Sequence, residues 1–233
     1  MQYPGGKNGS GVYQKIISLM PPHEVYVEGF LGSGAILRYK RPAKASIAID
    51  ADAAVIDMWK SMDHGIPNLG LRHGNVCQFL INQVGRDLPA TLIYLDPPYL
   101  FSTRSNRKYY KHEFGTEEEH IKMLHLVRRL NCMVIISGYP SDLYNRELAG
   151  WRKVSYTAQT HGGPVEEIAW MNYPEPTQLH DYRYLGENFR ERERIKRKKL
   201  RWSERLKTMP QLERLAILAA IQDLHADLSD TTR

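Results

Sequence analysis

Residues 24–35 read EVYVEGFLGSGA, an apolar segment that runs into a glycine-rich turn. Residues 24–28 predict a β-strand, and residues 35–39 predict the start of a helix. Glycine lets the backbone turn sharply and approach a ligand closely. Because ligands of parallel sheets bind beyond the carboxyl ends of the strands, this turn is a candidate binding site.

The alternation of strands and helices continues beyond this stretch. Further strands are predicted at residues 45–49, 92–95, 133–137, 153–158 and 167–172, and further helices at residues 53–61 and 116–130. Thr116, followed by three glutamates, is typical of a helix start. The pattern predicts an α/β, Rossmann-like fold: a mostly parallel sheet with helices on both faces and an antiparallel edge hairpin.

The positive charge of the chain is local. The 233 residues carry 32 Lys and Arg against 26 Asp and Glu, a formal net charge of +6. Residues 186–207 contain ten basic and four acidic residues, which accounts for the whole excess. Such a run favours an anionic partner such as nucleic acid. A solvated charged helix is the alternative interpretation.

The chain changes character after Tyr173, which predicts two domains. Residues 1–175 form the main domain, and residues 176–233 form a linker and a basic helical C-terminal extension. Pro210 is expected in the first turn of the last helix. Five apolar residues of that helix repeat every three positions and need the core, the basic helix or another subunit to cover them: Leu212, Leu215, Leu218, Ile221 and Leu224. This helix could therefore mediate dimerisation, and the oligomeric state stays open.

Several classes of protein are excluded by what the sequence lacks. The N-terminus has no apolar signal-peptide core, and no apolar run approaches the roughly 18 residues of a membrane span. We therefore expect a cytoplasmic protein. The two cysteines and nine histidines show no metal-ligand spacing, so no metal site is predicted.

Asp50 ends the second predicted strand, close to the glycine turn in a parallel sheet. In dinucleotide-binding folds an acid at this place accepts hydrogen bonds from ribose hydroxyls. The turn and Asp50 together predict a cofactor that contains a nucleoside. The spacing of Gly32 and Gly34 is GxG, which does not favour NAD.

A second motif, Asp96-Pro97-Pro98-Tyr99, follows the apolar strand at residues 92–95. The two prolines restrict the backbone and make a stiff tip. The Asp96 carboxylate and the Pro97 carbonyl are two acceptors for an exocyclic amine, and Tyr99 offers a ring on which a base can stack. These groups predict a pocket for a flipped-out adenine.

With these motifs the sequence resembles the Dam-like, or D12-class, DNA adenine-N6 methyltransferases, which use S-adenosylmethionine. The resemblance spans roughly residues 2–173 and rests on motifs in family order: YPGGK at residues 3–7, VEGFLGSGA at 27–35, AIDAD with Asp50, DPPY at 96–99 and EEIAWMNY at 166–173. It implies a methyltransferase fold for the Rossmann-like core.

The resemblance also implies roles for individual residues. Tyr3 and Lys7 would hold the amino-acid end of the cofactor, and the turn with Phe30, Gly32 and Gly34 its methionine and ribose parts. Asp50 would bind the ribose and Asn75 the cofactor's adenine, with Asp96 also in contact with the cofactor. Asp96, Pro97, Pro98 and Tyr99 would form the catalytic tip. Methyl transfer would be a direct displacement without a covalent enzyme intermediate or a metal.

One departure from the family concerns target recognition: Dam-like enzymes have a sizeable target-recognition domain between the ribose acid and the DPPY motif, and this sequence lacks it. Only about forty residues separate Asp50 from Asp96, too few for a further domain. We therefore expect short or relaxed sequence specificity, and the compact build fits a phage or a mobile element. Two segments are candidates for DNA contact. The loop at 101–114 offers Arg104, Arg107, Lys108, Tyr109, Tyr110 and Lys111, and the basic segment offers Arg194, Lys196, Arg197, Lys198, Lys199 and Arg201.

Alternative functions remain at this point. The DPPY tip does not read the sugar, so an RNA adenine methyltransferase is possible. Glutamine methylation in a protein needs similar acceptor geometry, but it does not require a basic tail. A non-catalytic nucleic-acid-binding protein on a methyltransferase core is the third alternative.

Overall fold

The computed structural model of the protein describes residues 6–9, 11–103, 114–160 and 163–230. The chain divides into two compact units, residues 1–184 and residues 185–233.

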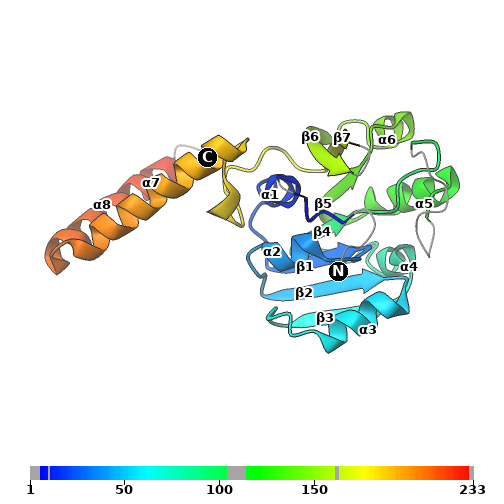
Figure 1. Ribbon diagram of the computed structural model, residues 1–233, viewed down its shortest axis with the longest axis horizontal. Helices are drawn as coiled ribbons and strands as arrows, with labels where there is room; N and C mark the ends of the chain where they lie inside the picture. Colours follow the sequence, from blue (N-terminus) through cyan, green and yellow to red (C-terminus); the bar gives the residue numbers. More distant parts are fainter. Residues whose placement is uncertain (1–5, 10, 104–113, 161–162, 231–233) are drawn as a thin grey trace. The chain divides into compact units, whose positions relative to one another are not determined.

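A seven-stranded sheet forms the centre of the first unit, in the order β3-β2-β1-β4-β5-β7-β6 (Figure 1). The strands are β1 Val25–Gly29, β2 Ala45–Asp50, β3 Leu69–His73, β4 Asp87–Leu95, β5 Asn131–Gly138, β6 Arg152–Thr160 and β7 Gly163–Met171. The first five strands are parallel, whereas β7 runs antiparallel to both β5 and β6. The predicted Rossmann-like fold with an antiparallel edge hairpin is confirmed.

Helices cover both faces of this sheet, as predicted. They are α1 Val12–Ile17, α2 Ala35–Tyr39, α3 Ala53–Ser61, α4 Val76–Ile81, α5 Glu117–Val127 and α6 Asp142–Glu147. Alternate strand residues point to opposite faces and so separate two apolar clusters. Tyr26 packs in the cluster that contains residues of α1, α2 and α3. Its neighbour Val27 packs in the cluster that contains residues of α4, α5 and α6.

The sequence patterns missed the short helices α1, α4 and α6, one strand and the length of another strand. β3 is the outer strand next to β2, and none of its residues is buried, so it lacks the apolar signal of a central strand. β4 begins at Asp87, five residues before the predicted start. Its pairing with β5 shifts register between Asp87 and Leu92, a stretch that contains Pro89. An irregular ladder tolerates a residue that has no N–H group to donate.

The parallel register brings three loops to one edge of the sheet. Gly29 pairs with Ile49 of β2 and with Leu95 of β4. The next residues along the three strands are Phe30, Asp50 and Asp96. The glycine turn, the predicted ribose acid and the DPPY motif are therefore neighbours.

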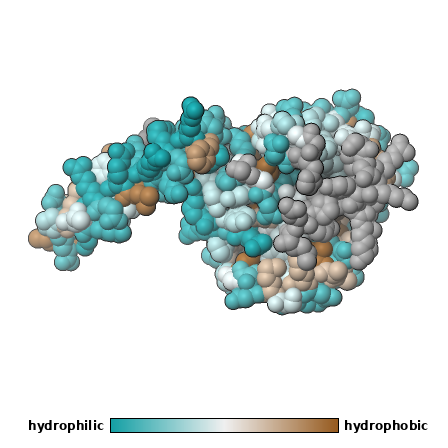
Figure 2. Space-filling model, in the orientation of Figure 1, coloured by the Kyte–Doolittle hydropathy of each residue, from teal (hydrophilic) through white to brown (hydrophobic). Residues whose placement is uncertain are grey.

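The second unit consists of α7 Phe189–Thr208 and α8 Gln211–Asp230. Pro210 lies directly before α8, and its carbonyl accepts the N–H group of Arg214 at 3.0 Å. No residue from 185 to 224 is buried. The five apolar residues predicted to need a partner are 41–81 % exposed. Figure 2 shows brown apolar patches between the teal polar residues of this unit.

The predicted linker is partly structured. The Asp181 carboxylate is buried and accepts the N–H group of Arg41 at 2.9 Å, and Arg183 donates to the Tyr39 carbonyl at 2.7 Å. Residues 180–184 therefore pack on the end of α2. Within the described ranges, no helix is long and apolar enough to cross a membrane.

Thr116 caps α5 through a capping box, in which its hydroxyl accepts the Glu119 N–H group at 3.3 Å. We expect Thr116→Ala to lower the free energy of unfolding by about 1 kcal/mol, because a helix N–H group loses its partner. Urea unfolding of the variant beside Thr116→Ser, which keeps the hydroxyl, measures this loss. Equal destabilisation by both changes would contradict the capping role.

Candidate active site

The glycine turn after β1 has an unusual backbone that glycine makes possible. Phe30, Gly32 and Gly34 all have positive φ angles, of 60°, 48° and 58°. A Cβ atom on Gly34 would lie 2.2 Å from the Trp59 ring, so a side chain does not fit there. The Trp59 indole N–H group donates to the Gly32 carbonyl at 3.2 Å and fixes the turn from α3. The missing side chain of Gly34 thus lets the Trp59 ring pack directly against the turn, and this packing makes the turn rigid.

Asp50 is connected to this turn. Its Oδ2 atom accepts the Gly32 N–H group at 2.9 Å, and its Oδ1 atom accepts the Asp52 N–H group at 2.8 Å. The carboxylate is only 6 % exposed, yet it lines the pocket at this edge of the sheet. The predicted proximity of Asp50 to the glycine turn is confirmed.

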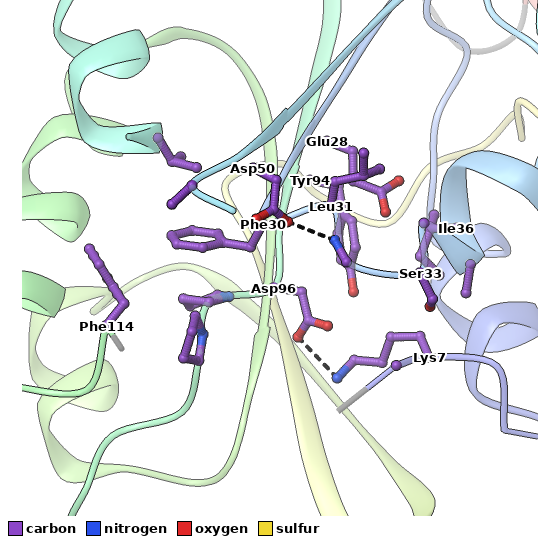
Figure 3. Close-up of a pocket in the computed structure, with 18 of the residues that line it drawn as sticks. Lys7, Glu28, Phe30, Leu31, Ser33, Ile36, Asp50, Tyr94, Asp96 and Phe114 are labelled. Atoms are coloured by element: carbon purple, nitrogen blue, oxygen red, sulfur yellow. Dashed lines mark hydrogen bonds and ion pairs between the residues drawn. The ribbon is translucent and has the colours of Figure 1, made fainter. Parts of the chain in front are cut away.

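This pocket gathers the predicted cofactor and catalytic residues that the structure describes (Figure 3). They are Lys7, Phe30, Gly32, Gly34, Asp50, Asn75, Asp96, Pro97, Pro98 and Tyr99. Asn75 also caps α4, since its side-chain oxygen accepts the Cys77 N–H group at 2.7 Å. Tyr3 was predicted beside Lys7 and lies outside the described residues.

The two oxygens of the Asp96 carboxylate have different surroundings. Oδ1 accepts from Ser137 at 2.8 Å, from Lys7 at 2.9 Å and weakly from Tyr99 at 3.5 Å. Among the described residues, none donates to Oδ2 or to the Pro97 carbonyl. One carboxylate oxygen thus holds the side chain in place, while the other and the carbonyl remain as acceptors for a ligand.

Lys7 connects two carboxylates. Its Nζ atom lies 2.9 Å from Asp96 and 3.1 Å from Glu167, and it also donates to the Tyr99 hydroxyl. Burial by itself would lower the pKa of Lys7, but the two carboxylates outweigh this effect and raise the pKa above its usual range. Lys7 is therefore charged, and these three side chains engage its three donors.

Burial also acts on the carboxyl groups of the site. It raises the pKa of Asp96, an effect that the charge of Glu167 increases and that Lys7 opposes. Burial raises the pKa of Glu28 to about 8, although a hydrogen bond from the Tyr26 hydroxyl at 2.8 Å favours its charged form. Glu28 lies at the end of β1 and lines the pocket.

His120 on α5 supports the DPPY motif. Its Nε2 atom lies 3.1 Å from the Pro98 carbonyl and 2.9 Å from the Phe114 carbonyl, and its Nδ1 atom lies 2.7 Å from the Tyr144 hydroxyl. Carbonyls only accept, so Nε2 carries the hydrogen and Nδ1 accepts from Tyr144. One imidazole thus fixes both the DPPY tip and the far end of the loop that follows it.

Sequence reasoning missed several of these residues. Glu28 and Glu167 are acidic residues in largely apolar strands. An acid in such a strand is a sequence signal of a buried carboxylate with a functional role. His120 and Ser137 had no such signal, because their contacts with the tip come from the packing of α5 and β5. Phe114 lines the pocket, and its ring centroid lies 5.2 Å from that of Phe30.

The predicted nucleic-acid residues fall into two groups. Arg104, Arg107, Lys108, Tyr109, Tyr110 and Lys111 lie outside the described residues. The other six, Arg194, Lys196, Arg197, Lys198, Lys199 and Arg201, are exposed on α7. Arg194 and Lys196 pair with glutamates at 3.3 Å and 3.7 Å. The remaining four have no ion-pair partner among the residues that the structure describes.

The region around the DPPY motif is similar to a known protein family. Residues 66–159 match the family model described as D12 class N6 adenine-specific DNA methyltransferase. The resemblance to the D12 class is confirmed. The match includes the DPPY motif and the loop after it, and it begins after the glycine turn and Asp50. No curated protein matches the sequence.

Solved structures of similar shape include three methyl-transferring enzymes. An rRNA methylase from Streptococcus thermophilus has 13 % identity and a TM-score of 0.43, covering 67 % of this chain and 92 % of that chain. A dimethyladenosine transferase from Plasmodium falciparum has 16 % identity and a TM-score of 0.45, with coverages of 73 % and 62 %. Magnesium protoporphyrin IX methyltransferase from Synechocystis PCC 6803 with bound SAM has 10 % identity and a TM-score of 0.45, with coverages of 65 % and 71 %. Such low identities leave the substrate of this chain open.

Glu28 should make stability depend on pH. Its folded pKa of about 8 exceeds its ordinary value of 4.5, so the folded state binds the proton more tightly and loses stability as pH rises between these values. We expect Glu28→Gln to be close to the wild type below pH 5 and more stable than it at pH 9, by about 1 kcal/mol or more. Denaturant unfolding across this range measures the difference. The exposed Glu166→Gln serves as control, and parallel curves for Glu28→Gln and the wild type would contradict the assignment.

Proposed function

We propose that the protein transfers a methyl group from S-adenosylmethionine to the N6 amine of adenine in DNA. The observation that carries this proposal is the arrangement of Asp96. Three protein donors approach its Oδ1 atom, while Oδ2 and the Pro97 carbonyl are left as two acceptors beside the glycine turn. An exocyclic amine has two hydrogens for these two acceptors. The D12 family match over this region supports adenine in DNA as the target.

The other end of the pocket suits the nucleoside part of the cofactor. The Asp50 carboxylate lines the pocket where ribose hydroxyls would donate to it, next to the backbone of the glycine turn. Phe30 and Phe114 provide apolar walls. When bound, S-adenosylmethionine supplies a methyl group on a positively charged sulfur. Tyr3, Lys7 and Asn75 remain our predicted contacts to its amino-acid and adenine ends. Lys7 would exchange one of its three protein partners for the cofactor.

The tip would act by positioning the target base. Asp96 and the Pro97 carbonyl orient the N6 lone pair toward the methyl group, and Tyr99 holds the base by stacking. His120 keeps Pro98 in place, so the two acceptors do not drift. A direct displacement needs no nucleophile from the protein. The chain would contribute orientation and electrostatic stabilisation.

The basic helix α7 supplies a surface for the phosphate backbone. Five exposed arginines, spaced four, three, four and four residues apart, share one side of the helix: Arg190, Arg194, Arg197, Arg201 and Arg205. Contacts to phosphates position a protein on DNA without reading its sequence. Between Asp50 and Asp96 the chain forms two strands of the central sheet, β3 and β4, and two helices that pack on it, α3 and α4. This leaves no segment for a separate recognition domain. Both features favour short or relaxed sequence specificity.

RNA is the second candidate substrate, because the tip does not contact the sugar of the target. Transfer to adenine in competing DNA and RNA, with labelled cofactor, separates the two. We expect methyl groups to appear on DNA adenines at short or variable motifs. A recognition motif of six or more bases would contradict relaxed specificity.

Asp96→Ala should reduce methyl transfer by more than about a thousandfold, because the substrate loses its main acceptor. The affinity for DNA should stay within a few-fold of the wild type. Rates with unmethylated DNA and binding by fluorescence anisotropy measure the two effects. Surviving transfer would overturn the catalytic assignment. Absence of transfer by the wild-type protein, to DNA and to RNA, would favour a non-catalytic binding protein.

The arginine face of α7 should determine the salt dependence of DNA binding. Replacing Arg194, Arg197 and Arg201 by Gln removes three phosphate contacts and should reduce the slope of log K against log salt by about 2 to 3. The matched control replaces Lys196, Lys199 and Lys207 by Gln, which removes the same charge from other sides of α7. Equal losses from both triple variants would show that net charge, and not this face, governs binding.

A further inference from the structure

Glu167 of β7 is buried beside the catalytic tip, although it does not line the pocket. Its side chain is 6 % exposed. Its Oε2 atom accepts from Lys7 at 3.1 Å and from the Tyr156 hydroxyl at 2.9 Å. The adjacent Glu166 is exposed on the same strand. Of these two neighbouring glutamates, Glu167 is the one that is buried next to Lys7.

Glu167 changes the charge of the cluster. Lys7 and Asp96, 2.9 Å apart, would be a neutral pair by themselves. With Glu167 the three side chains carry two negative charges and one positive charge. Their exposed fractions are 5 %, 17 % and 6 %, so water compensates little of the net negative charge. Among the residues that the structure describes, no second cation pairs with these two carboxylates. Uncompensated buried charge destabilises a fold, and a cationic partner would relieve this cost.

We propose that Glu167 stabilises methyl transfer by giving the Lys7–Asp96–Glu167 cluster a net negative charge beside the target amine. This inference rests on the proposed function. Glu167 would be a positioning residue, because it acts through Lys7 and not by contact with the substrate. Glu167 pairs with the ammonium group of Lys7. Its negative charge offsets the positive charge of Lys7, which would otherwise oppose the arrival of positive charge on N6.

The movement of charge during the reaction explains why a negative charge near N6 would favour methyl transfer. The N6 lone pair attacks the methyl carbon, so an N–C bond forms while the S–C bond breaks and its electron pair stays on sulfur. The sulfonium becomes a neutral thioether, and one positive charge moves to N6. N6 then loses a proton to Asp96 Oδ2, which passes it to solvent. A cluster with a net negative charge next to N6 stabilises the positive charge that develops on N6. The neutral Lys7–Asp96 pair alone would stabilise it less.

The test compares Glu167→Gln with the matched control Glu166→Gln. We expect Glu167→Gln to lower kcat roughly 10- to 100-fold, while the dissociation constants for S-adenosylmethionine and DNA stay within about twofold. Glu166→Gln should leave all three quantities unchanged. Glu167→Asp keeps the charge on a shorter side chain and should recover part of kcat. A purely steric role predicts the opposite order, because Gln has the shape of Glu.

The pH profile provides a second readout that steric effects do not move. The charge of Glu167 raises the pKa of Asp96, so Glu167→Gln should shift the acid limb of kcat to lower pH. Among the residues that the structure describes, the titratable groups that act on Asp96 besides Lys7 and Glu167 are Glu28, Tyr26, Tyr94, Tyr99, Tyr144 and Tyr156. All of them are unchanged in this variant.

Three outcomes would overturn the inference. They are an unchanged kcat in Glu167→Gln, a loss that appears only in cofactor or DNA binding, and a lower kcat for Asp than for Gln at position 167. Calorimetric cofactor binding and thermal unfolding identify variants that fail to fold. If Glu167→Gln fails to fold, the kcat of Glu167→Asp shows whether the negative charge at this position is required. A wild-type protein without methyl transfer would overturn the proposed function together with this inference. An active wild type with an equally active Glu167→Gln variant overturns the inference alone.

Discussion

The site depends on the parallel pairing of β1 with β2 on one side and β4 on the other. Gly29 is level with Ile49 and Leu95, so three chain segments leave the sheet at one edge. A shift by one residue would turn each strand's side chains to the opposite face and separate Asp50 and Asp96 from the glycine turn. The apolar clusters on both faces oppose such a shift, because the alternating residues Tyr26 and Val27 are packed on opposite sides.

Rigid supports surround the acceptors of the pocket. Trp59 holds the glycine turn, Ser137 and Lys7 hold Asp96, and His120 holds Pro98. These contacts come from α3, β5, the N-terminal segment and α5, which are distant in sequence. An acceptor that is fixed before the ligand arrives needs no reorganisation during the reaction. The strained turn and the buried charges are destabilising features, and both lie at the site.

The two units have opposite physical characters. The first contains all the buried apolar residues of the described chain, whereas residues 185–224 contain none. The net positive charge of the sequence resides in α7, and the exposed apolar residues concentrate in α8. The first unit is suited to chemistry in a low-dielectric pocket. The second consists of an exposed positively charged helix and a helix with exposed apolar residues.

The sequence by itself determined the local elements and the identity of the motifs. Strand and helix periodicity, the Thr116 cap and the glycines of the turn depend on neighbouring residues, so they can be predicted without the fold. The predicted positions of Asp50 and Asp96 followed from a general property of parallel sheets. β3 and the start of β4 were missed because an exposed outer strand and a strand interrupted by Pro89 lack a clear apolar pattern.

Only the tertiary structure decided which side chains surround the tip. Glu167 reaches Lys7 because β7 pairs antiparallel with β5, and the two residues are separated by most of the first unit. His120 reaches Pro98 because α5 packs behind β4. Such contacts arise from long-range pairing and packing, and no local pattern specifies them. The sequence thus identified the acceptors of the site, whereas the structure revealed the charges and supports that would make them effective.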